Sequence, residues 1–230
     1  MTPHKVWDDF PMRNKNSEKH QIILDAAVKV FARKGFYQSR VAEIAREAGV
    51  ADGTVYLYFK NKDDLLISIF EEKMREIIQR FHTVAGSGQD AGARFEALVR
   101  MHLTSFQADP DLAAVLQVEL RQSSRFMREY KKEELKRYLD IIGEIVEQGQ
   151  EEGIFRRDLP IWLVKRFIFG TLDELVSTWV QTGKGHDLES NAEPILDLFL
   201  RGIGSGACTP TKGASGEDAS GGDGNENTCG

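Results

Sequence analysis

The chain has 230 residues, of which 41% are apolar, and a net charge of −6. This size allows one or two domains with an ordinary hydrophobic core. No apolar run approaches the about 20 residues that span a membrane, and the first residues lack the basic and then apolar layout of a signal peptide. The composition therefore argues against a membrane protein, and we expect a cytoplasmic one.

The chain begins with residues 1–16, which look like a flexible arm. A helical pattern then runs from about Glu18 to Arg33 and ends at Gly35. Its continuous apolar face consists of Ile22, Ile23, Ala26, Ala27, Val30 and Phe31. We expect this helix to support the elements that follow, because helices of about two turns are only marginally stable alone.

Two short helical patterns come next, and Gly49 separates them, at a point where the chain must adopt a left-handed conformation. The first can be capped by Ser39. Its apolar stripe has a spacing of three and four residues, at Val41, Ile44, Ala45 and Ala48. The second runs from about Asp52 to Phe59, with Val55 and Phe59 facing inward. This arrangement is typical of a helix-turn-helix, a motif that binds duplex DNA.

Local charge supports this interpretation. Residues 13–62 contain ten Lys or Arg against five acidic residues, a net charge of +5, so the remainder carries −11. Such asymmetry indicates a nucleic-acid-binding module joined to another unit, although an ordinary solvated helix surface can show similar charge. Charge and helix-turn-helix spacing together favour DNA binding.

The rest of the chain is predicted to be helical almost throughout. Candidate helices cover residues 63–81, 91–107, 110–122, 125–153, 160–182 and 188–202, and no alternating strand pattern of useful length occurs. We therefore predict an all-α protein, with a three-helix head at 17–62 and a larger helical body at 63–204. Residues 205–230 are rich in Gly, Ser and Asp and are expected to be disordered. This tail contains Cys208 and Cys229, for which unstructured free thiols are favoured over a redox switch.

Residues 18–70 resemble the DNA-binding domain of TetR-type one-component repressors. The family signature is Phe-x-x-x-Gly-aromatic, then Ile-Ala-x-x-Ala-Gly-Val, then Gly-Thr-(aliphatic)-Tyr-x-(aromatic)-Phe-x-x-Lys. These pieces occur at Phe31–Phe36, Ile44–Val50 and Gly53–Lys62. The resemblance implies that phosphates are held by Arg40, Thr54, Tyr56, Tyr58 and Lys62. It implies that the residues nearest the base edges are Ala51, Asp52, Gly53, Thr54 and Val55.

Three of these positions have a physical argument of their own. Lys62 opens the fourth helix, where its ammonium and nearby N–H groups can meet a phosphate. At the cap of the recognition helix, where the family usually has Ser, this chain has Ala51. The acidic residue Asp52 follows it. An acid beside phosphates costs affinity unless it caps the helix or accepts from cytosine N4, and we favour the capping role.

The last two long helices have more apolar surface than one packed face needs. The apolar residues are Phe167, Phe169, Leu172, Leu175, Val176 and Trp179 on the first and Ile195, Leu198, Phe199 and Ile203 on the second. Both helices can simply close the core of the monomer. We favour pairing with the same helices of a second copy, as this family dimerises, because a homodimer places two heads on half-sites about one DNA turn apart.

The body also contains a candidate ligand pocket. Aromatic and aliphatic residues crowd its central helices, namely Leu103, Phe106, Leu116, Leu120, Phe126, Tyr130, Tyr138, Phe169 and Leu172. Basic residues are concentrated nearby, namely Arg121, Arg125, Arg128, Lys131 and Lys132. Apolar stripes form a core more often than a cavity, but this combination suits a ligand with an anionic head and a long apolar tail.

Three longer strings, VADGTVYLYFKNKDDLLISIFEEKM, VELRQSS and IFGTLDELVSTWV, resemble the FadR-type branch of the family. That branch represses fatty-acid degradation genes and leaves DNA on binding long-chain acyl-CoA. The resemblance implies an acyl chain inside the body and CoA phosphates on Arg121 and Arg125, with Arg128 and Lys131 as weaker candidates. If the connector helix swings when ligand binds, ligand and DNA weaken each other's binding by the same factor.

Two alternative functions compete with this one. Within the family, a regulator of efflux or stress genes could sense a cationic or aromatic compound, with Glu119, Asp173 and Glu174 as candidate partners. An enzyme is not expected, because the chain has no HExxH, Walker or GxSxG motif, and the loose GxGxxA match at residues 202–207 follows a helix rather than a strand. The five histidines form no ligand-spaced pair, so we expect no metal and no cofactor besides the effector.

Overall fold

The structure is a computed structural model that describes residues 15–85, 88–119, 133–183 and 185–204. In these ranges the regular elements are helices, with one isolated β-bridge between Phe155 and Gly204. The all-α prediction is confirmed. The predicted tail and most of the predicted arm lie outside the described residues. No helix in the described ranges is both long enough and apolar enough to cross a membrane.

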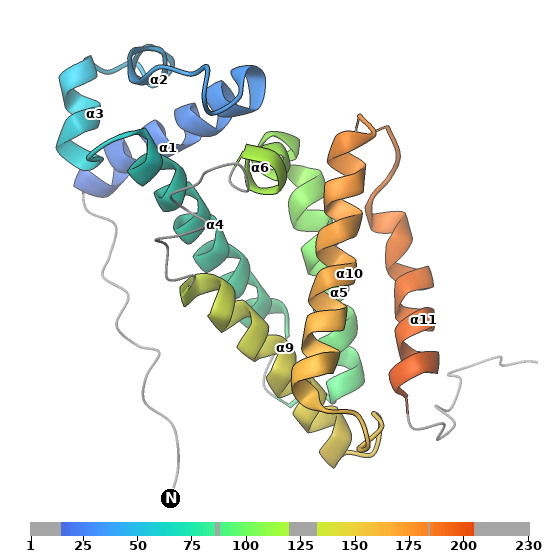
Figure 1. Cartoon of the computed structure of the whole chain (residues 1–230). Coiled ribbons are helices and arrows are strands. Elements are labelled where there is room, and N and C mark those ends of the chain that lie inside the picture. Colours follow the sequence, from blue (N-terminus) through green and yellow to red (C-terminus); the bar gives the residue numbers. More distant parts are fainter. Residues whose placement is uncertain (1–14, 86–87, 120–132, 184, 205–230) are drawn as a thin grey trace, which may run out of the picture.

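Three helices form the N-terminal head: α1 (Lys15–Lys34), α2 (Val41–Glu47) and α3 (Asp52–Tyr58). α2 packs on α1 and α3 packs on α2, so the three helices enclose a small core (Figure 1). That core contains the buried side chains of Phe31, Phe36, Ile44, Val55 and Phe59. As predicted, Gly49 is left-handed, with φ of +68°, which only glycine adopts without strain.

The start of α2 differs from the prediction. Arg40 rather than Ser39 is its N-cap residue, and the Arg40 N–H donates to Glu43 Oε2 at 3.0 Å. Ser39 is buried, and its hydroxyl donates to the carbonyl of Gly35 at 2.6 Å. The capping prediction for Ser39 is therefore wrong, because the turn after α1 uses this hydroxyl.

A single long helix, α4 (Lys62–Val84), connects the head to the body. Figure 1 shows its first turns beside α1 and its later turns beside α9. Leu65, Leu66 and Ile69 are buried near its start, and Ile77 and Phe81 are buried near its end. α4 thus contributes side chains to the cores of both parts.

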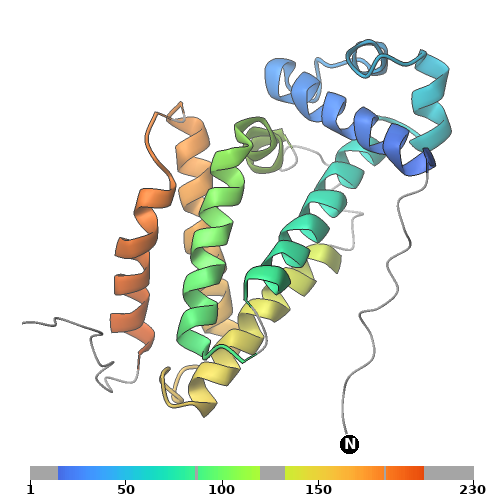
Figure 2. The ribbon, with the colours of Figure 1, turned by 180° about the vertical axis from the view of Figure 1, so that it is seen from behind.

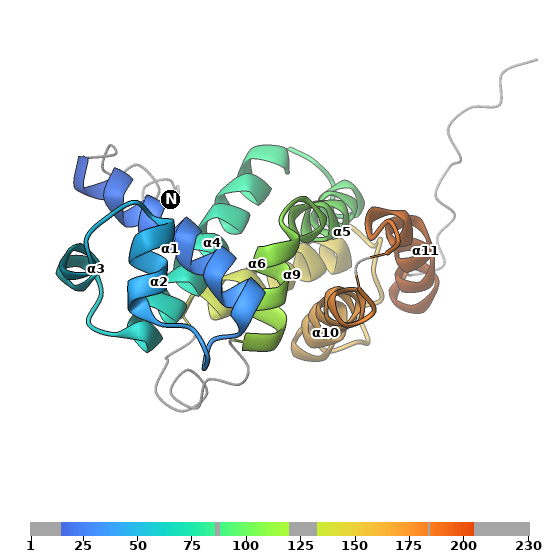
Figure 3. The same ribbon diagram turned by 90° about the horizontal axis from the view of Figure 1, so that it is seen from above.

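The body is built around α5 (Ala91–Ala108), which contacts α4, α9, α10 and α11. The other body elements are α6 (Pro110–Ala114), the π-helical turn η1 (Val115–Glu119), α9 (Glu133–Glu151), α10 (Ile161–Gln181), the 3-10 turn η2 (Glu189–Asn191) and α11 (Ala192–Ile203). Figures 2 and 3 show α11 at the edge of the body farthest from the head. α6 and η1 contact α1, so the head touches the body at a second place besides α4.

The helix expected over residues 110–122 is divided. Asp109 caps α6, since its carboxylate accepts from the Leu112 N–H at 3.0 Å. The chain then widens into η1, whose hydrogen bonds reach five residues back instead of four. A π-helical turn inserts one extra residue and changes which side chains face the interior, and such turns occur frequently at functional sites.

Gly149 in α9 provides a test of how tightly the body is packed. A Cβ added there would lie 2.1 Å from Cδ2 of Phe155, whose ring is buried and meets Phe95 edge-on with centroids 6.0 Å apart. We expect Gly149→Ala to lower the free energy of unfolding by about 1–3 kcal/mol, because the overlap outweighs the better helix propensity of alanine. Urea denaturation measures the change.

Gly143→Ala is the matched control, at another buried glycine of α9. Its added Cβ would meet the flexible side chain of Lys165 at 3.4 Å, so we expect a neutral effect or a gain of up to about 1 kcal/mol. Equal losses in the two variants would contradict this account.

Candidate functional site

The N-terminal half of α3 and the turn before it form an accessible surface on the head. Of the nine predicted DNA contacts, five are exposed: Arg40, Ala51, Asp52, Gly53 and Tyr56. Thr54 and Tyr58 are half-buried. The structure thus leaves these seven accessible, and their contacts with DNA stay predictions.

Val55 differs from this group. Its side chain is 2% exposed and packs in the core of the head. This burial contradicts a base contact by the Val55 side chain. The physical reason is helical spacing, because Val55 and Phe59 lie one turn apart on the inner face of the head.

Lys62 is also used differently from the expectation. Its ammonium donates to the carbonyls of Phe36 at 2.5 Å, Ser39 at 3.0 Å and Tyr37 at 3.3 Å. It also lies 4.4 Å from the centroid of the Phe36 ring. Burial lowers the pKa of Lys62. An ammonium has three N–H donors, so a phosphate contact, which stays a prediction, would compete with bonds that tie α4 to the turn between α1 and α2.

Sequence reasoning missed three accessible residues beside this surface. Leu57 in α3 is 82% exposed, Tyr37 is 63% exposed and Lys60 is exposed. The signal for Leu57 was present, because Val55 and Phe59 face inward and the residue midway between them must face outward. An exposed apolar side chain on a recognition helix can contact a thymine methyl group.

Ion pairs hold α2 on α1 behind this surface. Arg33 Nη2 lies 2.7 Å from Glu47 Oε2, and Lys34 pairs with Glu43. Hydrogen bonds from Arg33 and from Lys34 lower the pKa of Glu47 and Glu43, respectively. Both carboxylates therefore stay ionised at neutral pH. They compensate the positive charge of two of the basic residues of the head.

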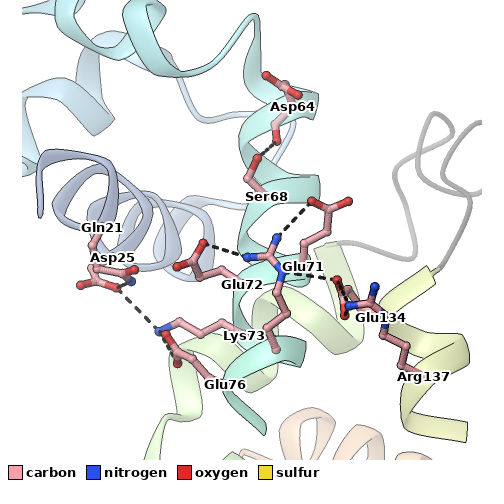
Figure 4. A network of polar contacts seen from close by, with 11 residues as sticks. Gln21, Asp25, Asp64, Ser68, Glu71, Glu72, Lys73, Glu76, Glu134 and Arg137 are labelled. Carbon is pink, nitrogen blue, oxygen red and sulfur yellow. Dashed lines mark hydrogen bonds and ion pairs between the residues drawn. The ribbon is translucent and has the colours of Figure 1, made fainter. Parts of the chain in front are cut away.

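Two neighbouring basic residues of α4 link the head to the body (Figure 4). Lys73 Nζ lies 3.8 Å from Asp25 Oδ1 in α1. Arg75 Nε lies 3.3 Å from Glu134 Oε1 in α9, and its other nitrogens lie 3.5 Å from Glu71 and Glu72. The side chain of Glu134 is only 11% exposed, so this pair is better shielded from solvent than most surface ion pairs. The network joins both parts of the protein to one short stretch of α4.

The interior of the body contains the predicted apolar ligand contacts. Leu103, Phe106, Leu116 and Leu172 are buried, and Phe169 is half-buried. The remaining predicted contacts, Leu120, Arg121, Arg125, Arg128 and Lys131, lie outside the described residues. The apolar part of the predicted pocket is therefore in the core, and its use by a ligand stays a prediction.

A polar cluster lies within this apolar interior. His102 of α5 shares a hydrogen bond with Tyr138 of α9, with 2.8 Å between Nδ1 and Oη. Gln117 of η1 donates to Asp173 of α10, with 2.9 Å between Nε2 and Oδ1. The charge of Asp173 also acts on both His102 and Tyr138, which places the four residues in one cluster. Burial lowers the pKa of His102 to about 4 and raises the pKa of Tyr138, so both are neutral at pH 7.

Two atoms of this cluster are buried and have no hydrogen-bond partner among the residues that the structure describes, namely Nε2 of His102 and Oε1 of Gln117. Leaving one such atom unpaired costs about 1–3 kcal/mol. The sequence prediction includes neither residue, because His102 has no ligand-spaced partner histidine and Gln117 lies in an apolar run. A histidine one turn from Phe106, on a helix face that also holds Leu98, was the available signal.

The acids considered for a cationic effector are placed differently from one another. Asp173 is half-buried and accepts from Gln117. Glu174 is exposed and hydrogen-bonds to Thr178 on the surface of α10. The side chain of Glu119 lies outside the described part of the chain. Of the two candidate acids whose side chains the structure describes, Asp173 is the one that approaches the interior.

Most residues predicted at a dimer interface are buried within the monomer. Leu172, Val176, Trp179, Ile195, Phe199 and Ile203 close the core, which corrects the expectation for these six. Phe167 and Leu198 remain 63% and 72% exposed. Leu163 and Gly170 are exposed on the same side of α10 as Phe167, and no atom lies within 4 Å of the position of a Cβ at Gly170. This smaller apolar face is accessible to a second helix.

Comparisons with known proteins agree with this architecture. Residues 23–69 match the family model described as bacterial regulatory proteins, tetR family, and residues 70–202 match the model of the YsiA-like protein C-terminal region. The chain belongs to the TetR family of bacterial regulatory proteins. The DNA-binding interpretation of the head therefore has independent support.

Several relatives of this regulator are similar over nearly their whole length. The fatty acid metabolism regulator protein of Bacillus subtilis is 42% identical over 80% of this chain and 95% of its own. The solved structure of the fatty acid degradation regulator FadR from Bacillus halodurans matches with a TM-score of 0.78 and 42% identity, over 82% of this chain and 98% of that one. A structure of FadR from Bacillus subtilis in complex with stearoyl-CoA matches with a TM-score of 0.76 and 42% identity, over 80% and 99%.

Asp52 allows the DNA-binding face to be tested. Ala51 occupies the N-cap of α3 and Asp52 is its first residue, so the capping role predicted for Asp52 is wrong. Its carboxylate gains only the interaction with the helix dipole, about 0.3–1 kcal/mol.

We expect Asp52→Asn to change thermal stability little and to change binding to a selected operator duplex strongly, since a negative charge beside phosphates is removed. Glu18→Gln, an exposed acid in the first turn of α1, controls for the dipole. A large loss of stability with unchanged DNA binding would contradict this assignment.

His102 makes folding sensitive to acid. Its folded pKa of about 4 lies below the ordinary value of 6.5, so the unfolded chain binds a proton first. Its contribution to stability is complete above about pH 6.5 and is lost as the pH falls toward 4, by roughly 3 kcal/mol in total. Urea denaturation at several pH values should show a flatter dependence in His102→Leu than in the wild type over this range. Parallel curves would count against the assignment.

Proposed function

We propose that this TetR-family regulator represses genes of fatty acid metabolism and leaves its operator when it binds a long-chain acyl-CoA. The observation that carries the proposal is the 42% identity to the Bacillus subtilis fatty acid metabolism regulator, which extends over 95% of that protein and so includes the helical body. The related Bacillus subtilis structure is a complex with stearoyl-CoA.

The interior of the body supports an effector with a long apolar chain. Leu103, Phe106, Leu116 and Leu172 offer only hydrocarbon surface, on which each buried methylene gains about 0.8 kcal/mol. A cationic effector has less support, because Glu174 faces solvent and Asp173 is already bonded to Gln117. The basic residues at 121–131 remain our proposed partners for the CoA phosphates.

Release from DNA follows from the position of α4. An acyl chain that enters between α5, α9 and α10 displaces helices on which α4 packs. Because α4 is continuous with the head, such a displacement changes where α3 points. Two heads of a dimer then no longer fit successive major grooves, and DNA and ligand weaken each other's binding by the same factor.

The direct test is a titration of the operator complex. Palmitoyl-CoA should dissociate a fluorescently labelled operator duplex, while CoA alone at the same concentration should not. Mass analysis of ligand carried through purification separates the two effector classes. Saturation with palmitoyl-CoA that leaves operator affinity unchanged would refute the proposal.

Arg75→Gln tests the route between the two sites. The substitution removes the ion pairs of Arg75 with Glu71, Glu72 and Glu134 but does not touch the apolar interior. We expect palmitoyl-CoA affinity within about threefold of the wild type and a coupling factor reduced by about fivefold or more, from operator titrations with and without ligand. Arg201→Gln, which breaks an exposed pair with Asp197 on α11, is the control. An unchanged coupling factor in Arg75→Gln would exclude this route.

A homodimer is part of the proposal, and Phe167 tests it. Phe167→Glu places a charge on the exposed face of α10. We expect it to convert a dimer into a monomer in analytical ultracentrifugation and to weaken operator binding, because one head alone reads too few bases. Val84→Glu, at a 51% exposed apolar position on α4, is the control. A variant that stays dimeric would place the interface elsewhere.

A further inference from the structure

The two unpaired atoms of the buried cluster define what a ligand must offer. His102 is 4% exposed and Gln117 is 7% exposed, so no surface role explains them. Buried polar groups nearly always have a partner. The rings of Phe106 and Phe169 lie 5.0 Å from His102 and 6.2 Å from Tyr138, so any group that pairs with these atoms must be attached to an apolar molecule.

The hydrogen bond to Tyr138 determines which tautomer the neutral imidazole of His102 adopts. If Nδ1 donated to Tyr138, the phenolic proton and the Nε2 lone pair would both lack a hydrogen-bond partner in the described part of the chain. If Tyr138 donates to Nδ1, the phenolic proton is paired and Nε2 carries the hydrogen. His102 then presents a neutral N–H donor to the interior.

Gln117 presents a hydrogen-bond acceptor to the interior. Its amide nitrogen donates to Asp173, which fixes the orientation of the amide and leaves Oε1 as an acceptor. The π-helical turn η1 holds this side chain in the interior, within an otherwise apolar run. Within the described ranges, this cluster therefore offers one donor and one acceptor without a partner, on two different elements.

We propose that this cluster recognises the thioester of the effector: His102 Nε2–H donates to the thioester carbonyl, and Gln117 Oε1 accepts from the first amide N–H of the CoA arm. This inference rests on the proposed function and names the part of the ligand that is read. An acyl thioester of CoA carries an acceptor and then a donor, separated by the sulfur and two methylenes. A free fatty acid offers a charged carboxylate with acceptors only, and burying that charge beside Asp173 is unfavourable.

The role of each residue is thereby distinct. His102 and Gln117 contact the ligand, while Tyr138 and Asp173 are positioning residues that fix the tautomer of one and the orientation of the other. The cluster sets how deeply the acyl chain enters, because the thioester is held at one depth. It also distinguishes the activated acid from the free acid, which shares its apolar chain.

The test compares two ligands that differ in one oxygen. Palmitoyl-CoA contains the thioester carbonyl, and S-hexadecyl-CoA is the thioether without it. Calorimetric titration below their micelle concentrations should show that the wild type binds palmitoyl-CoA about tenfold more tightly. His102→Leu should reduce this ratio to less than about twofold, mainly by weakening palmitoyl-CoA.

Further variants separate recognition from folding. Tyr138→Phe keeps the ring of His102 in place but releases its tautomer, so the ratio should fall even if His102→Leu folds poorly. Gln117→Leu should weaken both ligands by a similar factor and leave the ratio unchanged, because both contain the amide. The exposed controls His186→Leu and Gln79→Leu should change neither affinity.

The outcomes distinguish this inference from the proposed function. Tight binding of both ligands with a wild-type ratio near one would overturn recognition of the carbonyl by His102, while an acyl-CoA regulator would stand. A ratio that persists in His102→Leu would overturn it as well. Failure of the wild type to bind either ligand would overturn both proposals.

Discussion

The continuity of α4 is the constraint on which the rest of the structure depends. Its first turns bury Leu65, Leu66 and Ile69 in the head, and its last turns bury Ile77 and Phe81 in the body. Protein cores are packed almost as densely as organic crystals, so neither end can move without repacking its neighbours. A helix fixed at both ends transmits displacement as a rigid element. The head can therefore take only orientations that the packing of the body permits.

Ion pairs of α4 and a second helix contact supplement this rigid connection between head and body. Lys73 faces Asp25 of the head, and Arg75 faces the nearly buried Glu134 of the body, within one turn of α4. The π-helical turn η1 gives a second contact, since it touches both α1 and α10. Gln117 lies in this turn, so the polar cluster in the interior is only one element away from the first helix of the head. The proposed effector site and the DNA-binding head thus share two independent physical connections.

At the DNA-binding face, sequence reasoning succeeded where local spacing decides the outcome. The turn at Gly49 and the inward positions of Val55 and Phe59 follow from helix geometry and backbone sterics. It failed where a side chain had several partners to choose from. Ser39 bonds to Gly35 instead of capping α2, and Lys62 bonds to three carbonyls of the turn after α1. In both cases the acceptors are carbonyls of the turn between α1 and α2, which local helix spacing does not predict.

The sequence by itself determined the all-α class, the helix-turn-helix and the family, because these depend on periodic apolar residues and on turn residues at short spacing. Only the tertiary structure decided which apolar residues of α10 and α11 are buried in the monomer, and which polar residues meet inside the body. His102, Gln117, Tyr138 and Asp173 come from four elements spread over some seventy residues. Their hydrogen bonds depend on how α5, η1, α9 and α10 pack together. No local pattern in the sequence encodes such a meeting.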